Sequence, residues 1–95
     1  MSYLVIIAKN AIRISGKFLP AIKPLLVDEL EILAKNPYGA SALTGRFSWL
    51  RSWHVHFKGV PYRIIFEIEE KTKRVLVHLI AKRADAYRLL ERLYK

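Results

Sequence analysis

The sequence predicts an α+β fold in which a small, mainly antiparallel sheet carries an N-terminal helical hairpin and a C-terminal helix. Three observations predict this class. A short apolar run opens the chain, two segments with helical spacing follow it, and three alternating segments precede a last amphipathic one. The expected order is β-α-α-β-β-β-α, with the last three strands in an antiparallel meander. A chain of 95 residues suffices for one domain with a single core, spanning residues 1–95.

Residues 3–8 are the first predicted strand, because they form a continuous β-rich apolar run. Such a run is typical of a strand covered on both faces or of an inner strand. Residues 9–19 are expected to form a helix with Asn10 as its cap, although Gly16 weakens it. The apolar positions of this helix are Ala11, Ile12, Ile14, Phe18 and Leu19.

A second helix is expected to have Pro20 and Pro24 at its start, because the first turn of a helix tolerates proline. It is expected to stop at Asn36 and Pro37. Its main apolar stripe consists of Ile22, Leu26, Leu30 and Leu33. Three more apolar residues lie off this stripe, namely Leu25, Val27 and Ile32. They indicate either a wide core face or a groove for a partner.

Residues 53–69 predict a hairpin with one basic, hydrated side. In its first strand, Trp53, Val55 and Phe57 alternate with His54, His56 and Lys58, so both imidazoles and the ammonium share one face. The break at 59–61 is expected to turn the chain, and a second alternating strand follows behind Arg63.

The remaining segments complete the predicted order. Residues 37–45 are small and turn-forming and are expected to be a loop. A turn at 70–72 leads into a strand over 74–80, which contains His78 as a core or rim residue. Residues 84–94 predict a helix that packs through Ala86, Leu89, Leu90 and Leu93 and exposes Arg88, Glu91 and Arg92.

Charge and composition narrow the class of protein. The hydrophobic content of 53% excludes a disordered tail, and the net charge of +9 indicates a polyanionic partner such as nucleic acid, or an acidic protein. Residues 46–95 carry twelve Lys/Arg against five Asp/Glu, a net +7, whereas residues 1–45 carry five against three, a net +2. The basic surface therefore belongs to the second half.

The absence of cysteine excludes a disulfide framework, a zinc-finger pattern and a thiol nucleophile. The opening apolar run lacks a basic leader and is too short for a signal-peptide core or a membrane span. We therefore expect a cytoplasmic protein with no membrane partner.

An ordered set of short motifs resembles the RelE/ParE superfamily of bacterial and archaeal type II toxins. The set consists of Leu43-Thr44-Gly45, Pro61-Tyr62-Arg63, Ile80-Ala81-Lys82-Arg83 and Tyr87, and the likeness spans essentially the whole chain. The resemblance implies a RelE-like fold. RelE-like members are ribosome-dependent endoribonucleases that cut messenger RNA in the A site, whereas ParE-like members poison DNA gyrase, so the fold alone does not choose between them.

The resemblance also implies a catalytic set of His54, His56, Arg63, Arg83 and Tyr87. The best-known RelE arrangement has lysines where this chain has the two histidines. Histidine can transfer a proton near neutral pH, and arginine grips phosphate through two donors. We assign His54 as general base and His56 as phosphate contact or acid. Tyr87 is left with three roles: stacking on a base, orienting the 2′-hydroxyl, or relaying a proton.

Each candidate also has a plain structural interpretation. The histidines could be ordinary surface residues, and Arg63 and Arg83 could pair with Glu67 and Asp85. Tyr87 could pack against Leu90 and Tyr94, and Trp49 and Trp53 are expected to pack at the core or its edge. No carboxylate accompanies the histidines on their face, so no metal or other cofactor is expected. The expected electrostatic contacts to RNA are Arg46, Arg51, Lys58, Lys82 and Arg88.

The resemblance implies three partners: a cognate antitoxin protein, the ribosome and messenger RNA. A toxin-antitoxin hetero-oligomer would bind operator DNA through the antitoxin. The alternatives are a ParE-like inhibitor of DNA gyrase and a non-catalytic nucleic-acid-binding member of the fold. The presence of His54, His56 and Tyr87 together disfavours the gyrase inhibitor, which needs none of them.

Overall fold

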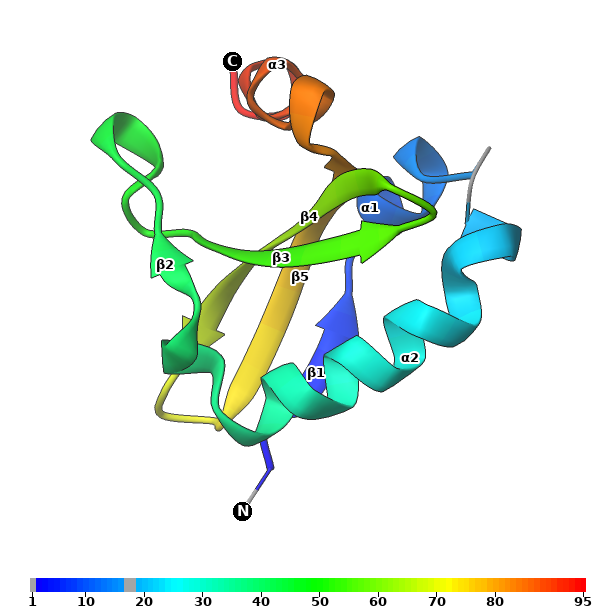
Figure 1. The fold of residues 1–95 in the computed structure, drawn as a ribbon. Coiled ribbons are helices and arrows are strands. Elements are labelled where there is room, and N and C mark those ends of the chain that lie inside the picture. Colours follow the sequence, from blue (N-terminus) through cyan, green and yellow to red (C-terminus); the bar gives the residue numbers. More distant parts are fainter. Residues whose placement is uncertain (1, 17–18) are drawn as a thin grey trace.

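A five-stranded sheet with the order β1-β5-β4-β3-β2 forms the centre of the molecule (Figure 1). The structure is a computed structural model, and it describes residues 2–16 and 19–95. β1 runs parallel to β5, and the other neighbouring pairs are antiparallel, which confirms the predicted mainly antiparallel sheet and its meander. The strands are β1 (Leu4–Ile7), β2 (Ser41–Ala42), β3 (Arg51–Phe57), β4 (Val60–Glu69) and β5 (Arg74–Lys82).

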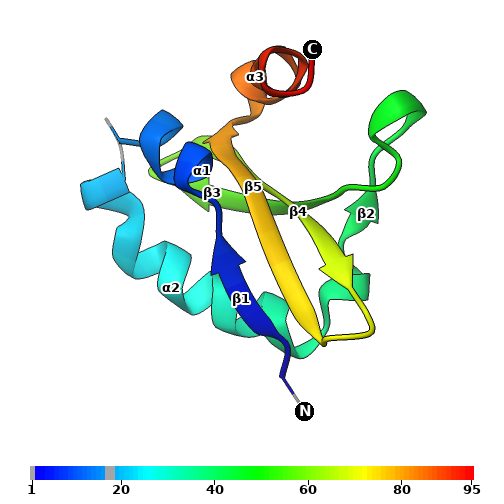
Figure 2. The same cartoon turned by 180° about the vertical axis from the view of Figure 1, so that it is seen from behind.

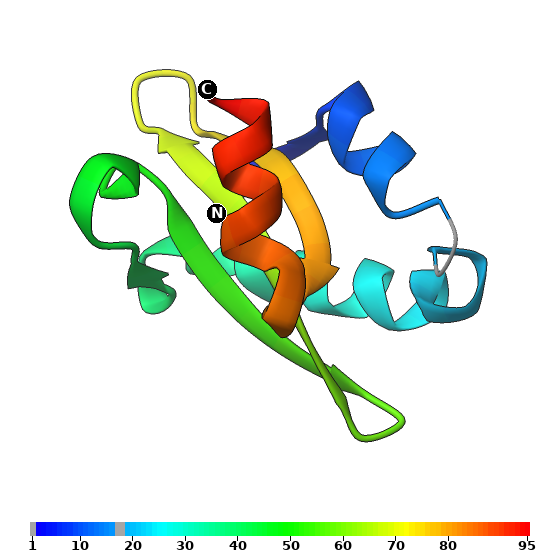
Figure 3. The same cartoon turned by 90° about the horizontal axis from the view of Figure 1, so that it is seen from above.

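Helices cover both faces of this sheet. α2 lies against one face and α3 against the other, and the view from above shows α3 crossing the sheet (Figures 1 and 3). Within the described ranges, no helix combines the length and the apolar character that a membrane crossing requires. The helices are α1 (Lys9–Ile14), α2 (Leu19–Lys35) and α3 (Arg83–Leu93), with short 3₁₀ turns η1 (Pro37–Gly39) and η2 (Gly45–Phe47).

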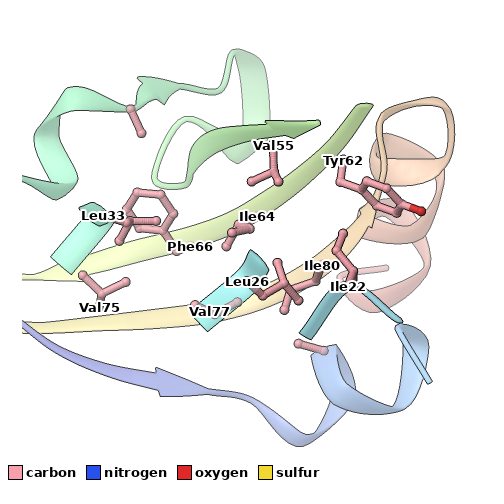
Figure 4. Close-up of a cluster of buried hydrophobic side chains, with 12 residues drawn as sticks. Ile22, Leu26, Leu33, Val55, Tyr62, Ile64, Phe66, Val75, Val77 and Ile80 are labelled. Carbon is pink, nitrogen blue, oxygen red and sulfur yellow. The ribbon is translucent and has the colours of Figure 1, made fainter. Parts of the chain in front are cut away.

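The larger core lies between α2 and the sheet (Figure 4). The stripe predicted on α2 supplies Ile22, Leu26 and Leu33 to it, because residues three or four apart share one side of a helix. Phe66 of β4 is fully buried against them. The strand side chains that alternate toward this face complete the cluster: Val55, Tyr62, Ile64, Val75, Val77 and Ile80.

A smaller core lies between α3 and the opposite face of the sheet. Ala86 and Leu90 are buried there, and Leu89 and Leu93 pack at its margin, as predicted for this helix. The partners of α3 are Phe47, Leu50, Ile65, Leu79 and Ala81. This second core fixes the helix above the basic face of the hairpin.

β1 is an edge strand, so the prediction of an inner or doubly covered strand is wrong. Figure 2 shows it at the border of the sheet, next to β5. Val5 and Ile7 pack on the α2 side, whereas Leu4 is 63% exposed and Ile6 is 37% exposed on the other. An apolar run cannot distinguish the two positions, because the number of neighbouring strands depends on pairing with distant residues.

The first helix differs from its prediction at both ends. α1 starts at Lys9 with Ala8 as its N-cap and no side-chain cap bond, so the assignment of Asn10 as cap is wrong. It ends at Ile14 instead of extending through the apolar residues beyond it. The predicted core position Phe18 lies outside the described residues.

Pro24 lies inside α2 and not in its first turn, which corrects the predicted helix start. Proline has no N–H, so Pro24 cannot donate the helical hydrogen bond to the carbonyl of Pro20, four residues earlier. Only this one bond, near the start of the helix, is lost. Of the three apolar residues off the main stripe, Leu25 packs on the core, while Val27 is 47% and Ile32 is 53% exposed.

The predicted loop over 37–45 also contains a short strand. Ser41 and Ala42 form β2 and pair with Ser52 and Arg51 at the start of β3. Two residues are too few for an alternating pattern, so this pairing could not be predicted from the sequence.

The hairpin between β3 and β4 turns earlier than predicted. Lys58 has φ 50° and Gly59 has φ 78°, as a two-residue type I′ turn requires. Val60 and Pro61 therefore already belong to β4, which corrects the predicted break at 59–61. The pairing of β5 with β4 ends at Tyr62. Pro61 has no N–H to donate, and no hydrogen bond to β5 is required of it.

A β-bulge changes the face on which His78 lies. Ile65 pairs with Leu79 and Phe66 pairs with Val77, so the intervening His78 has no partner in the register. Consequently His78 shares the α3 face, where it contacts Tyr94, and does not lie in phase with the buried Ile80. It is partly buried, as predicted for a rim histidine.

Glu70 joins three separate segments. Its Oε2 accepts hydrogen bonds from the hydroxyls of Tyr3 and Tyr38, both at 2.8 Å, and its other oxygen pairs with Lys73. Bonds from Lys73, Tyr3 and Tyr38 lower the pKa of this carboxyl to about 2.

We expect the Glu70 carboxyl to titrate near pH 2 when followed by carbon NMR. A depressed folded-state pKa stabilises the fold above the unfolded value of 4.5, and this contribution is lost as pH falls toward 2. Glu70→Gln should therefore lower the melting temperature at neutral pH. It should also reduce the loss of stability that the unmodified protein shows between pH 4.5 and pH 2. Glu31→Gln, on the exposed side of α2, is the control. A Glu70 titration midpoint near 4.5 would contradict the network.

Candidate nucleic-acid site

A pocket of about 290 Å³ opens between α3 and the basic side of the hairpin. Four of the five residues of the predicted catalytic set line it: His54, Arg63, Arg83 and Tyr87. They come from β3, β4 and α3, so the fold brings together residues that span more than thirty positions of the sequence.

Strand register and helix periodicity place these four side chains. His54 lies directly opposite Arg63 in the β3–β4 ladder, so their side chains share one face. Arg63 lies in turn opposite Ala81 of β5. Two residues later Arg83 begins α3, and Tyr87 follows one helical turn along the same side.

The two arginines keep their charge available for an anion. Arg63 donates one hydrogen bond to the carbonyl of Tyr62, at 3.2 Å. Across residues 2–16 and 19–95, neither Arg63 nor Arg83 forms an ion pair. The carboxylates considered as their partners are engaged elsewhere, Glu67 with His78 at 2.7 Å and Asp85 with Arg88 at 3.0 Å. The ion-pair interpretation of the two arginines is therefore wrong.

The electrostatics of the pocket favour an uncharged His54. Partial burial lowers the pKa of its imidazole, and the positive charges of Arg63, His56 and Arg83 lower it further. Burial and the proximity of Arg83 also lower the pKa of Arg63. An uncharged imidazole has a free nitrogen lone pair, so His54 is prepared to accept a proton at neutral pH.

We expect proton NMR to place the pKa of His54 below 6.5, and Arg63→Gln to raise it part of the way back. The unfolded chain binds this proton more readily than the folded one, so His54 should reduce the stability of the fold as pH drops below 6.5. Arg92→Gln, at the far end of α3, is the control and should leave the titration midpoint of His54 unchanged. A midpoint above 6.5 in the unmodified protein would contradict this account.

His56 and Tyr87 are exposed, as are His54 and Arg83. His56 is exposed, lies opposite Pro61 and is not among the residues that line the pocket, although its charge contributes to the lowered pKa of His54. Tyr87 is 51% exposed and lines the pocket, so it is not a core aromatic against Leu90 and Tyr94. Both can therefore meet a strand that crosses the mouth of the pocket.

The five cations predicted to contact RNA fall into two groups. Lys58 is at the hairpin tip, while Lys82 and Arg88 line a second groove, between α1 and α3. Arg88 also pairs with Asp85 at 3.0 Å, and Arg46 pairs with Glu91 at 3.3 Å and donates to the carbonyl of Tyr94. The remaining cation, Arg51, has a structural contact described next.

Arg51 lies on the opposite face of β3 from His54, because side chains alternate along a strand. It donates to the carbonyl of Ala40 at 2.7 Å and covers the ring of Tyr38. The structure therefore does not bring this guanidinium into the pocket.

The two tryptophans pack as expected at the edges of the two cores. Trp53 packs against the larger core and donates its indole N–H to Glu29 at 3.2 Å. Trp49 is 46% exposed and forms edge-to-face contacts with His78 and Tyr94.

Six further pocket residues were not predicted as part of the site. Ser52 could have been found from the sequence, because it lies two positions before His54 on the same strand and therefore shares its face. The others depend on the pairing of β2 and on the docking of α3. They are Ser41, Leu43, Ile65, Ala86 and Leu90. In the described part of the chain, no group of three or more His, Asp or Glu side chains is placed to hold a metal ion.

The sheet order, the helices on both faces and the basic pocket beneath the last helix define an α+β fold with an open surface site. Its particular form is the RelE-like fold. The chain has a TM-score of 0.72 with a mutant of the E. coli toxin RelE in the free state, at 18% identity, covering 96% of this chain and 93% of that one.

Two further solved structures share this fold. The toxin-antitoxin complex RelBE2 from Mycobacterium tuberculosis has a TM-score of 0.70 at 22% identity, over 87% of this chain and 100% of that one. The isolated E. coli RelE toxin has a TM-score of 0.66 at 14% identity, over 97% and 99%. No protein-family model and no curated protein matches the sequence.

Proposed function

We propose that this protein is the toxin of a type II toxin-antitoxin system and acts in the cytoplasm as a ribosome-dependent endoribonuclease. It would cut messenger RNA in the A site by acid-base chemistry that needs no metal, and residues 1–95 would form one toxin domain. The observation that carries the proposal is the pocket in which His54, Arg63, Arg83 and Tyr87 meet while both guanidiniums remain without an ion pair among the described residues. The RelE-like fold supports the same class.

In the proposed reaction, His54 removes the proton from a ribose 2′-hydroxyl. The 2′-oxygen then forms a bond to the adjacent phosphorus, and the bond from phosphorus to the 5′-oxygen of the next nucleotide breaks. The products are a 2′,3′-cyclic phosphate and a 5′-hydroxyl end. The lowered pKa of His54 supports its role as base, because only the uncharged imidazole can accept the proton.

Arg63 and Arg83 would stabilise the dianionic phosphorane through charge-assisted hydrogen bonds. The departing 5′-oxygen needs a proton, which His56 would donate, or alternatively Tyr87 through a relay. The exposure of both side chains supports contact with a strand that lies across the pocket. Lys58, Lys82 and Arg88 would attract the RNA backbone of the message or the ribosome.

We propose a cognate antitoxin as the protein partner. An acidic antitoxin segment would complement the net charge of +9, and an apolar helix could cover Val27 and Ile32, which are 47% and 53% exposed on α2. One of the similar structures is a toxin-antitoxin complex. The resulting hetero-oligomer would bind operator DNA through the antitoxin.

Expression of the chain in bacterial cells tests the enzymatic proposal. Primer extension should show messenger RNAs cut within the reading frame, and purified protein should cut a message bound to ribosomes but not the same message alone. Intact messages together with DNA-damage signalling would indicate the gyrase inhibitor instead. Intact messages without damage would indicate a non-catalytic binding protein.

Co-expression with the product of the adjacent reading frame tests the antitoxin. The complex should lose cleavage activity, and its melting temperature should exceed that of the free chain, since a ligand of the folded state stabilises it. A complex that leaves both properties unchanged would contradict the pairing.

A further inference from the structure

Ser52 is a largely buried residue of the pocket, and its hydroxyl forms no hydrogen bond with the described residues. Ser52 and Ser15 are the buried polar side chains of the described residues, at 6% and 0% exposure. The hydroxyl of Ser15 bonds to the carbonyls of Ala11 at 2.8 Å and Ile12 at 3.1 Å. No hydrogen bond of the Ser52 side chain is found within residues 2–16 and 19–95, and Ser52 lines the pocket beside His54. No buried side-chain N or O atom of the described residues lacks a partner, so the Ser52 hydroxyl is open to the pocket, where a ligand can reach it.

A second hydroxyl lies next to it. Ser41 of β2 is directly opposite Ser52 of β3 and also lines the pocket. Directly opposite residues point to the same face, with their Cβ atoms about 4.5–5.5 Å apart. Neither serine side chain bonds to the other in the described structure, so two adjacent hydroxyls are available, each able to donate and to accept.

The rest of this part of the pocket is apolar. Leu43 is partly exposed there, above the buried side chains of Ile65, Ala86 and Leu90, and this apolar surface suits a flat ring better than an anion. The volume of about 290 Å³ lies just below the usual range for small-molecule sites, which suits a ligand as small as a single base. Ser52 and His54 are two residues apart on β3, a spacing of roughly 6.6 Å, so a ligand here would lie beside the proposed cleavage point.

We propose that Ser41, Ser52 and this apolar surface form a subsite for one nucleobase of the RNA, on a nucleotide that flanks the cleaved phosphate. The two hydroxyls bond to polar atoms on the edge of the base, and Leu43 contacts one of its faces. The cleaved phosphate itself binds to Arg63 and Arg83. The inference rests on the proposed nuclease function and adds to it the residues that select the cleavage site.

Mapping of cleavage sites across a pool of messages tests the subsite. The unmodified protein should prefer one base, or one pair of bases, at a single position beside the cut. Ser52→Ala removes the hydroxyl and Ser52→Val also fills space, so both should reduce this preference by about tenfold. Ser48→Ala, at an exposed serine beyond η2, is the matched control. An unchanged base distribution in both Ser52 variants would overturn the subsite.

A binding experiment separates failure of the subsite from failure of the nuclease proposal. AMP, GMP, CMP and UMP are titrated singly into the labelled protein, with inorganic phosphate as the reference. The preferred nucleotide should shift the amide signals of Ser41 and Ser52, whereas phosphate should not, and Ser52→Val should abolish the shift. These shifts without any RNA cleavage would retain the subsite and reject the nuclease. Cleavage without them, and with an unchanged base distribution, would retain the nuclease and reject the subsite.

Discussion

Replacing His54 with alanine is expected to lower the rate of messenger RNA cleavage on the ribosome by about 10²–10⁴-fold, the usual contribution of a general base. The physical reason is the lowered pKa of His54, which keeps the imidazole uncharged near neutral pH and able to accept the 2′-hydroxyl proton. Single-turnover cleavage of a defined message is the measurement, because it reports the chemical step without product release.

The dependence of this rate on pH tests the role of each histidine separately. A base that must be uncharged produces a limb on the acid side of the profile, below the ordinary histidine value of 6.5. His54→Ala should remove that limb, and His56→Ala should alter a different part of the profile if His56 is the acid. Loss of the same limb in both variants would contradict separate roles.

Lys71→Ala is the control for the His54 variant, because Lys71 is exposed in the turn between β4 and β5 and lies outside the pocket. It should cleave at the unmodified rate. Cleavage by His54→Ala at the same rate as this control would show that the imidazole is not the base.

The second large effect concerns the core that supports the site. Leu33→Ala should lower the free energy of unfolding by roughly 2–5 kcal/mol, the range for truncating a buried leucine. Leu33 is fully buried between α2 and the sheet, close to Phe66 in the same cluster (Figure 4), so its loss leaves a cavity. Urea unfolding followed by circular dichroism is the measurement.

The adjacent residue provides the matched control. Ile32 is 53% exposed on the other side of α2, and Ile32→Ala should change the free energy of unfolding by less than about 0.5 kcal/mol. Equal losses at both positions would mean that the α2 stripe is not the core face. A small loss at Leu33 alone would mean that the core collapses around the vacancy.

The order of elements was predictable because it depends on local periodicity. The spacing of Ile22, Leu26 and Leu33 indicates a helix with one buried side, and all three are buried as expected. Alternation in the hairpin likewise assigned His54 and Arg63 to one face, which the register confirms. The errors lie at the ends of elements, as at Asn10 and Pro24, where few local interactions decide the boundary.

The candidate site was predictable in part for the same reason. The strand residues could be found from their alternation, and Arg83 and Tyr87 were added through the resemblance to RelE-like toxins. The serine pair Ser41 and Ser52 was missed, because their adjacency depends on the pairing of β2 with β3. The face on which His78 lies could not be predicted either, since the bulge that shifts it is a property of two strands and not of one.

The sequence by itself therefore determined the element order, the uneven positive charge and the basic face of the hairpin, because each depends on residues within a few positions of one another. Only the tertiary structure decided that β1 is an edge, that β2 exists, and that α3 closes over His54 and Arg63 to form a pocket. These features depend on pairing and packing between distant segments. The free energy of such contacts is set by the whole fold and leaves no local pattern in the chain.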